Sequence, residues 1–103
     1  MKKLALLIGL LLSASAYSQD ALVHINAEFN KSNDWYGLEL VENVKLYSGY
    51  LESNASMQER YSITKVPTLI LYRDGVEVHR WEAGLDMKLH VKVTEVQNKI
   101  YED

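Results

Sequence analysis

The stretch Tyr61-Ser62-Ile63-Thr64-Lys65-Val66-Pro67-Thr68-Leu69 decides the fold, because it sets the only proline of the chain directly before a strand-like run. The run Thr68–Arg73 is almost entirely apolar, a pattern typical of a central strand that is buried on both faces. Proline lacks the N–H that a sheet requires, so it is tolerated at the first residue of such a strand and not inside it. The stretch therefore predicts where a central strand begins.

A hairpin follows this strand. The runs Thr68–Arg73 and Val76–Trp81 flank Asp74-Gly75, and two strand-like runs joined by Asp-Gly are a strong hairpin signal. The second run alternates apolar and polar residues, which predicts an edge strand with one solvated face.

Two further strands and a helix are predicted upstream. Ala21–Ile25 is a short apolar run that indicates a buried strand, and Val44–Leu51 indicates a second one. Between them, Ser32 or Asn33 can cap a helix, whose apolar positions are Trp35, Leu38 and Val41.

Two helices complete the predicted fold. A short one is expected over 54–61, starting at Asn54 or Ser56. A C-terminal helix capped by Asp86 is expected from the helical spacing of four apolar residues, Leu89, Val93, Val96 and Ile100. Strands that alternate with helices and end in a hairpin predict an α/β fold with a mixed sheet.

Residues 1–19 have the order of regions found in a secretory signal peptide. Lys2 and Lys3 precede the apolar run Leu4–Leu12, and small residues follow it. Nine apolar residues are too few for a bilayer, which needs about 20; an uncleaved signal anchor is the alternative. Cleavage is expected after Ala16 or Ser18. These features predict export to the periplasm or beyond, from a bacterium, and a single domain over residues 20–103.

Charge and cysteine content narrow the function classes. Without Lys2 and Lys3 the chain has 9 basic and 14 acidic residues, a net charge of −5, and it has no cysteine. This balance argues against nucleic acid and against stable membrane association as partners. Three histidines, His24, His79 and His90, lack metal-ligand spacing, so no metal or cofactor is expected.

On two segments the chain resembles the thioredoxin-like fold family. Ala27-Glu28-Phe29-Asn30-Lys31-Ser32-Asn33-Asp34 is similar to the family's Ala-Glu-Trp-Cys-x-x-Cys-Lys, and 61–69 is similar to its Tyr-x-Ile-x-x-Val/Ile-Pro-Thr-Leu. Gly84 falls where the family has a late glycine. The resemblance implies a minimal thioredoxin-like fold, βαβ-α-ββα, with a four-stranded mixed sheet and a cis Val66–Pro67 bond. The family's initial strand and helix are missing, which leaves a sheet edge less covered than usual.

The departures from the family pattern concern its chemistry. Asn30 and Asn33 stand where the resemblance places two cysteines, with Lys31 and Ser32 between them. Disulfide exchange needs a thiolate nucleophile and a second, resolving thiol, so no thiol–disulfide oxidoreductase and no enzyme activity is expected. His24 falls where the family buries an acidic residue, and we expect a neutral, hydrogen-bonded core histidine there.

The resemblance implies a redox-inactive binding module. An extended peptide or a partner protein would lie in the groove beside Pro67 and pair with Val66 as an added strand. The expected groove residues are Phe29, Trp35, Val66, Pro67, Ala83 and Gly84, with a rim of Asn30, Lys31 and Ser32. Two alternatives remain: a self-associating subunit that uses the edge Val76–Trp81, and a non-redox enzyme that would depend on Glu28, Lys31 or His24.

Overall fold

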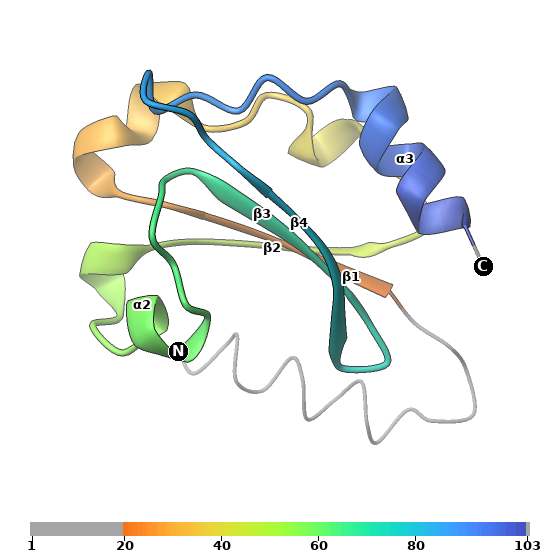
Figure 1. Cartoon of the computed structure of the whole chain (residues 1–103), viewed down its shortest axis with the longest axis horizontal. Helices are drawn as coiled ribbons and strands as arrows, with labels where there is room; N and C mark the ends of the chain where they lie inside the picture. The colour runs from red at the N-terminus through yellow and green to blue at the C-terminus, as the bar shows by residue number, and fades with distance from the viewer. Residues whose placement is uncertain (1–19, 103) are drawn as a thin grey trace.

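Four strands form one mixed sheet in the computed structural model, which describes residues 20–102 (Figure 1). They are β1 (Asp20–Asn26), β2 (Lys45–Tyr50), β3 (Thr68–Arg73) and β4 (Val76–Glu82), in the spatial order β2-β1-β3-β4. β1 is parallel to β2 and antiparallel to β3, and β4 is antiparallel to β3. The predicted four-stranded mixed sheet is confirmed. The predicted signal peptide lies outside the described residues.

The β3–β4 hairpin forms where Asp-Gly predicted it. Asp74 and Gly75 have φ angles of 54° and 81°, the left-handed values that a tight hairpin turn of this kind needs at both central residues. β3 is buried along almost its whole length, whereas β4 lies at the edge of the sheet and is largely exposed. The contrast between an apolar run and an alternating run therefore distinguished the central strand from the edge strand correctly.

The prediction of a helix after β1 is wrong. Two short 3₁₀ helices, η1 (Glu28–Asn33) and η2 (Leu38–Leu40), occupy this connection. Asp34 has an extended backbone with ψ of 139°, and the N–H of Trp35 donates to the side chain of His24 at 3.1 Å. The ψ of Asp34 lies far outside the helical range, so the backbone leaves helical geometry where the apolar spacing indicated the first turn of a helix.

The C-terminal helix starts later than predicted. α3 spans Val93–Tyr101 and its N-cap position is Lys92, so Asp86 does not cap it. Asp86 Oδ1 instead accepts the backbone N–H of Lys88 at 3.1 Å in a turn. Met87 there has a left-handed φ of 60°, a conformation that a right-handed helix excludes. The helix was predicted one turn too early because Leu89 packs on the core, like the apolar residues of α3, without being helical.

The short helix before β3 forms close to its predicted position. α2 spans Met57–Arg60 and is preceded by the 3₁₀ helix η3 (Leu51–Ser53). Ser56 occupies the N-cap position without a side-chain cap, while Asn54 Oδ1 accepts the N–H of Ser56 at 3.2 Å. Both candidate start residues thus take part in the turn that begins this helix.

Each face of the sheet carries its own apolar core. The α2-side core is formed by Ala21, Val23, Ile25, Ala27, Met57, Tyr61, Ile63, Val66, Ile70 and Tyr72. The α3-side core is formed by Leu22, Trp35, Val41, Leu69, Leu71, Val91, Val96 and Ile100. Because successive side chains of a strand point to opposite faces, Leu22, His24 and Asn26 of β1 all face the α3 side. None of the helices between residues 20 and 102 has the length and hydropathy of a membrane span.

Candidate functional site

An asparagine cluster occupies the end of β1, where the chain enters η1. Asn30 is only 5% exposed. Its Nδ2 donates to Asn26 Oδ1 at 3.1 Å and to the carbonyl oxygen of Met87 at 3.0 Å, and it lies 3.5 Å from the carbonyl oxygen of Val66. Its Oδ1 accepts a hydrogen bond from Asn33 Nδ2 at 2.7 Å. One buried amide therefore joins β1, η1, the loop before β3 and the loop after β4.

The cluster extends to an acidic residue and a tyrosine. Asn26 is fully buried, and its Nδ2 donates to the carbonyl oxygen of Asn30 at 2.9 Å and to Asp34 Oδ1 at 2.8 Å. The hydroxyl of Tyr50 donates to the other carboxylate oxygen of Asp34. This hydrogen bond to Asp34 raises the pKa of Tyr50 to about 12. Buried polar groups are stable only when they have such partners, so the cluster is a satisfied network rather than a set of free nucleophiles.

His24 is a hydrogen-bonded core residue, as the sequence predicted. It is 2% exposed, its Nε2 accepts the N–H of Trp35 at 3.1 Å, and its Nδ1 lies 3.3 Å from Ser48 Oγ. An Nε2 that accepts a hydrogen bond requires the proton to be on Nδ1, so the ring is neutral. Burial lowers the pKa of His24 below its usual 6.5, and the nearby Asp34 carboxylate opposes this only in part.

Acidification is expected to destabilise the protein through His24. The unfolded histidine takes up a proton near pH 6.5, whereas the folded one resists protonation until a lower pH. The unfolded state therefore binds more protons between these two pKa values, and the free energy of unfolding falls by at most about 1.4 kcal/mol per pH unit as the pH drops through that window. Urea unfolding between pH 8 and pH 5 measures this slope.

The control for this measurement is the exposed histidine His90, which pairs with Asp86 at 2.6 Å. His24→Gln should remove most of the slope below pH 6.5, while His90→Gln should leave it in place. An unchanged slope in His24→Gln would assign the acid sensitivity to other groups.

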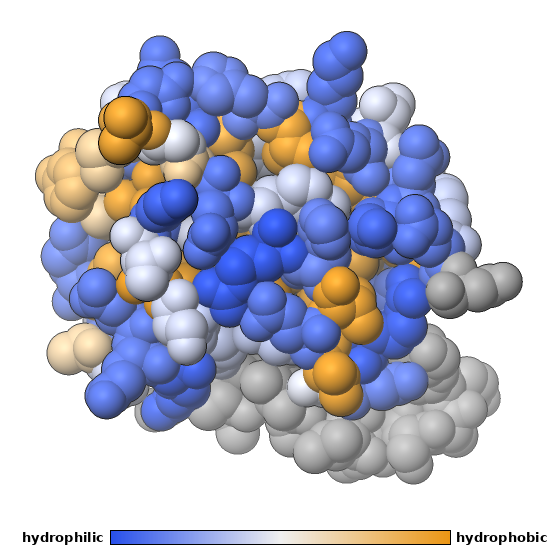
Figure 2. Space-filling model, in the orientation of Figure 1, coloured by the Kyte–Doolittle hydropathy of each residue, from blue (hydrophilic) through white to orange (hydrophobic). Residues whose placement is uncertain are grey.

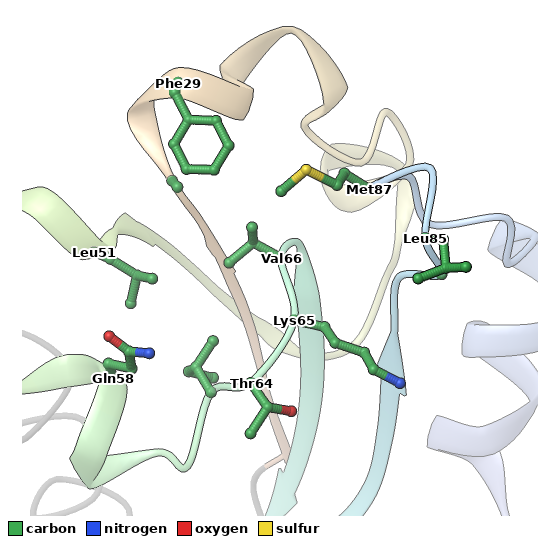
Figure 3. Close-up of a pocket in the computed structure, with 11 residues that line it drawn as sticks. Phe29, Leu51, Gln58, Thr64, Lys65, Val66, Leu85 and Met87 are labelled. Carbon is green, nitrogen blue, oxygen red and sulfur yellow. The ribbon is translucent and has the colours of Figure 1, made fainter.

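An apolar pocket of about 300 Å³ lies next to the asparagine cluster, beside the Val66–Pro67 bond, which is cis (Figure 3). It is lined by Ala27, Phe29, Leu51, Gln58, Ile63, Thr64, Lys65, Val66, Gly84, Leu85 and Met87. Phe29 is 73% exposed and Leu85 is fully exposed. Figure 2 shows hydrophobic surface at this end of the molecule, over η1 and the segment that follows β4. Exposed large apolar side chains around a pocket are typical of a binding surface.

The structure divides the predicted groove residues into two groups. Phe29, Val66 and Gly84 line the pocket. Ala83 is 1% exposed, and its N–H donates to the carbonyl oxygen of Pro67 at 3.1 Å; neither of these two residues lines the pocket.

The assignment of Trp35 to the groove is wrong. Trp35 is 4% exposed and belongs to the α3-side core, where its Nε1 donates to the carbonyl oxygen of Val91 at 3.0 Å. Trp35 follows Asp34, where the backbone leaves helical geometry, and its apolar ring is buried in the core rather than displayed at the groove.

Of the predicted rim residues, Lys31 and Ser32 lie on the outside of η1, whereas Asn30 is buried. Lys31 and Ser32 are exposed, and Lys31 Nζ lies 5.8 Å from the centre of the Tyr50 ring. Asn33 is half-buried through its bond to Asn30. Of the four positions that resemble Cys-x-x-Cys, only Asn30 contacts a wall of the pocket.

Sequence reasoning missed several residues of the site. Asn26 carried a signal, because it shares the strand face of Leu22 and His24 and a buried asparagine must find partners. Leu85 and Met87 lie in an irregular loop, where no periodicity marks which side chains line a cavity. Between residues 20 and 102, no three His, Asp or Glu side chains form a group that could hold a metal ion.

Comparison with known proteins shows the fold and nothing finer. No protein-family model matches the sequence, and a search of curated proteins found no match. Fasciola hepatica thioredoxin is similar in structure, with 18% identity and a TM-score of 0.62 over 94% of this chain and 88% of that one. A mutant thioredoxin from Halobacterium salinarum has 18% identity and a TM-score of 0.62 over 87% of this chain and 79% of that one.

Oxidised thioredoxin from Plasmodium falciparum is also similar, with 12% identity and a TM-score of 0.61 over 95% of this chain and 92% of that one. At such low identity these likenesses concern the arrangement of helices and strands only. Since the sequence contains no cysteine, a dithiol reaction has no thiol to start from. The chain has a thioredoxin-like fold with a cysteine-free core.

Proposed function

We propose that the protein is a redox-inactive binding module that takes up an extended peptide segment of a partner protein. One observation carries the proposal: an apolar pocket beside Val66 and Pro67 whose rim residues Phe29 and Leu85 are left exposed to water. Burial of such side chains against a ligand is favourable by roughly 25 cal/mol per Å² of apolar surface. Without cysteine the contact is noncovalent and reversible.

The size and position of the pocket favour one large apolar side chain of the ligand. A volume of about 300 Å³ is at the small end of the range for ligand pockets, and it can hold one leucine, phenylalanine or tryptophan side chain. Val66 lies at the pocket wall, and Pro67 separates it from Thr68, the first residue of β3. An extended peptide can pair with the backbone there while its side chain enters the pocket, which is recognition by strand addition.

Replacing Phe29 by serine is expected to weaken peptide binding by about ten- to a hundredfold, the equivalent of roughly 1.5–3 kcal/mol for one buried phenylalanine. The measurement is a nuclear magnetic resonance titration of the labelled protein with end-blocked heptapeptides that carry a central tryptophan. Amide shifts should cluster at Ala27, Phe29, Val66 and Met87.

Leu40 offers a matched control, because it is 61% exposed on η2 and does not line the pocket. Leu40→Ser should bind the same peptides with unchanged affinity. Shifts that cluster away from the pocket, or equal losses in the two variants, would count against the proposal.

A second candidate function is self-association through the edge strand β4. Val76 is 64% exposed and Val78 is 43% exposed on this strand, and an unprotected edge can pair with a second copy. Sedimentation across a range of concentrations tests this, because a strict monomer at high concentration contradicts it.

A further inference from the structure

One positively charged side chain lies among the mostly apolar residues that line the pocket. Lys65 is the only charged side chain among the described residues that line it, and it is exposed. Figure 3 shows its side chain extending from the loop away from Phe29, Leu51 and Gln58. Within residues 20–102, no carboxylate forms an ion pair with its ammonium group.

The carboxylates of two residues that adjoin pocket residues in the sequence already have partners other than Lys65. Asp86, next to Leu85, pairs with His90 at 2.6 Å and accepts the N–H of Lys88. Glu52 accepts the backbone N–H of Glu28 at 2.8 Å. The ammonium group at the rim of the pocket therefore remains available to an anion supplied by the ligand.

We propose that this pocket selects peptides in which a large apolar residue is accompanied, within two residues, by an aspartate or glutamate side chain that pairs with Lys65. The proposal rests on the proposed function and names its ligand class. Lys65 directly precedes Val66, and an extended peptide rises about 3.3 Å per residue. An acidic side chain one or two positions from the apolar anchor can therefore reach the ammonium group.

The net charge of the protein makes this preference diagnostic. Residues 20–103 carry a net charge of −5, so general electrostatic attraction would favour basic peptides and disfavour acidic ones. A preference for acidic peptides can then come only from a local contact.

The test compares three end-blocked peptides with a central tryptophan that differ only two residues to either side of it, where they carry glutamate, glutamine or lysine. Affinity is read from the amide shifts of Phe29 and Val66. At low salt the glutamate peptide is expected to bind about two- to fivefold more tightly than the glutamine peptide, the usual size of an exposed ion pair, and the lysine peptide more weakly than either. Salt should reduce these differences.

Lys65→Glu should reverse the order of the three peptides. Lys31→Glu changes the net charge equally but lies on the outer side of η1, so it should preserve the order. Equal affinity of the three peptides at the pocket would overturn the acidic preference and leave the proposed function standing, whereas absence of shifts at the pocket with all three would overturn both. Tighter binding of an uncharged peptide with a free C-terminal carboxylate than of the blocked glutamate peptide would also overturn it.

Discussion

Replacement of Asn30 by aspartate is expected to destabilise the fold by roughly 3–5 kcal/mol at pH 7, the usual cost of an uncompensated buried charge. The Asn30 amide donates to Asn26 and to the carbonyl oxygen of Met87, and it lies close to that of Val66. An aspartate has the same shape, but its carboxylate oxygen would replace the NH₂ group and would face the same three acceptor oxygen atoms without a proton to donate. In a small domain, where net stability is itself on the order of 5 kcal/mol, such a variant would be largely unfolded.

The pH dependence separates this mechanism from a simple packing defect. Burial among acceptors raises the pKa of the introduced carboxyl group above its unfolded value of about 3.9. The penalty is therefore absent below that pH, where the group is neutral in both states, and it grows as the pH rises toward the folded-state pKa. Urea unfolding of wild type and variant, compared at pH 4 and pH 7, should show the gap between them narrowing in acid.

Asn33→Asp is the matched control for Asn30→Asp. Asn33 is half-buried, and its amide makes the single bond to Asn30 Oδ1. Asn33→Asp is therefore expected to cost about 1 kcal/mol, the value of one lost hydrogen bond. The added charge costs little more, because water can still reach the new carboxylate. Equal losses in the two variants would show that the amide of Asn30 does not hold the four segments together.

The sheet and its hairpin could be predicted because their signals are local. Thr68–Arg73 is almost entirely apolar since it lies between two covered faces, and Asp74-Gly75 supplies the two left-handed residues that the turn needs. The burial of His24 followed from its place inside an apolar strand. Each of these features depends on neighbours in the sequence or on the period of a strand.

The connection after β1 could not be predicted in this way. Trp35, Leu38 and Val41 have helical spacing, yet the N–H of Trp35 bonds to His24 and Asp34 adopts an extended conformation. Apolar spacing does not indicate where a backbone leaves helical geometry, as it does at Asp34 with a ψ of 139°. Part of the pocket lining, such as Leu85 and Met87, was missed because its walls come from separate segments that only the folded chain brings together.

Trp35→Ala is expected to lower the free energy of unfolding by about 3–5 kcal/mol, as large-to-small changes of buried aromatic residues do. The ring packs so closely on Gly37 that a Cβ atom there would lie 2.7 Å from it and 2.6 Å from Val93 of α3. Its indole N–H also bonds to the carbonyl oxygen of Val91. Removing the ring opens a cavity between η2 and α3 and leaves that carbonyl without its partner.

Phe29→Ser provides the opposite case, because Phe29 is 73% exposed and its removal should change stability by less than about 0.5 kcal/mol. Urea unfolding and peptide titration of both variants together separate a residue that holds the fold from one that contacts the ligand. Trp35→Ala should lose stability and, in its folded fraction, retain peptide affinity, whereas Phe29→Ser should keep stability and lose affinity. If Trp35→Ala kept its stability and lost peptide affinity instead, the indole ring would belong to the groove after all.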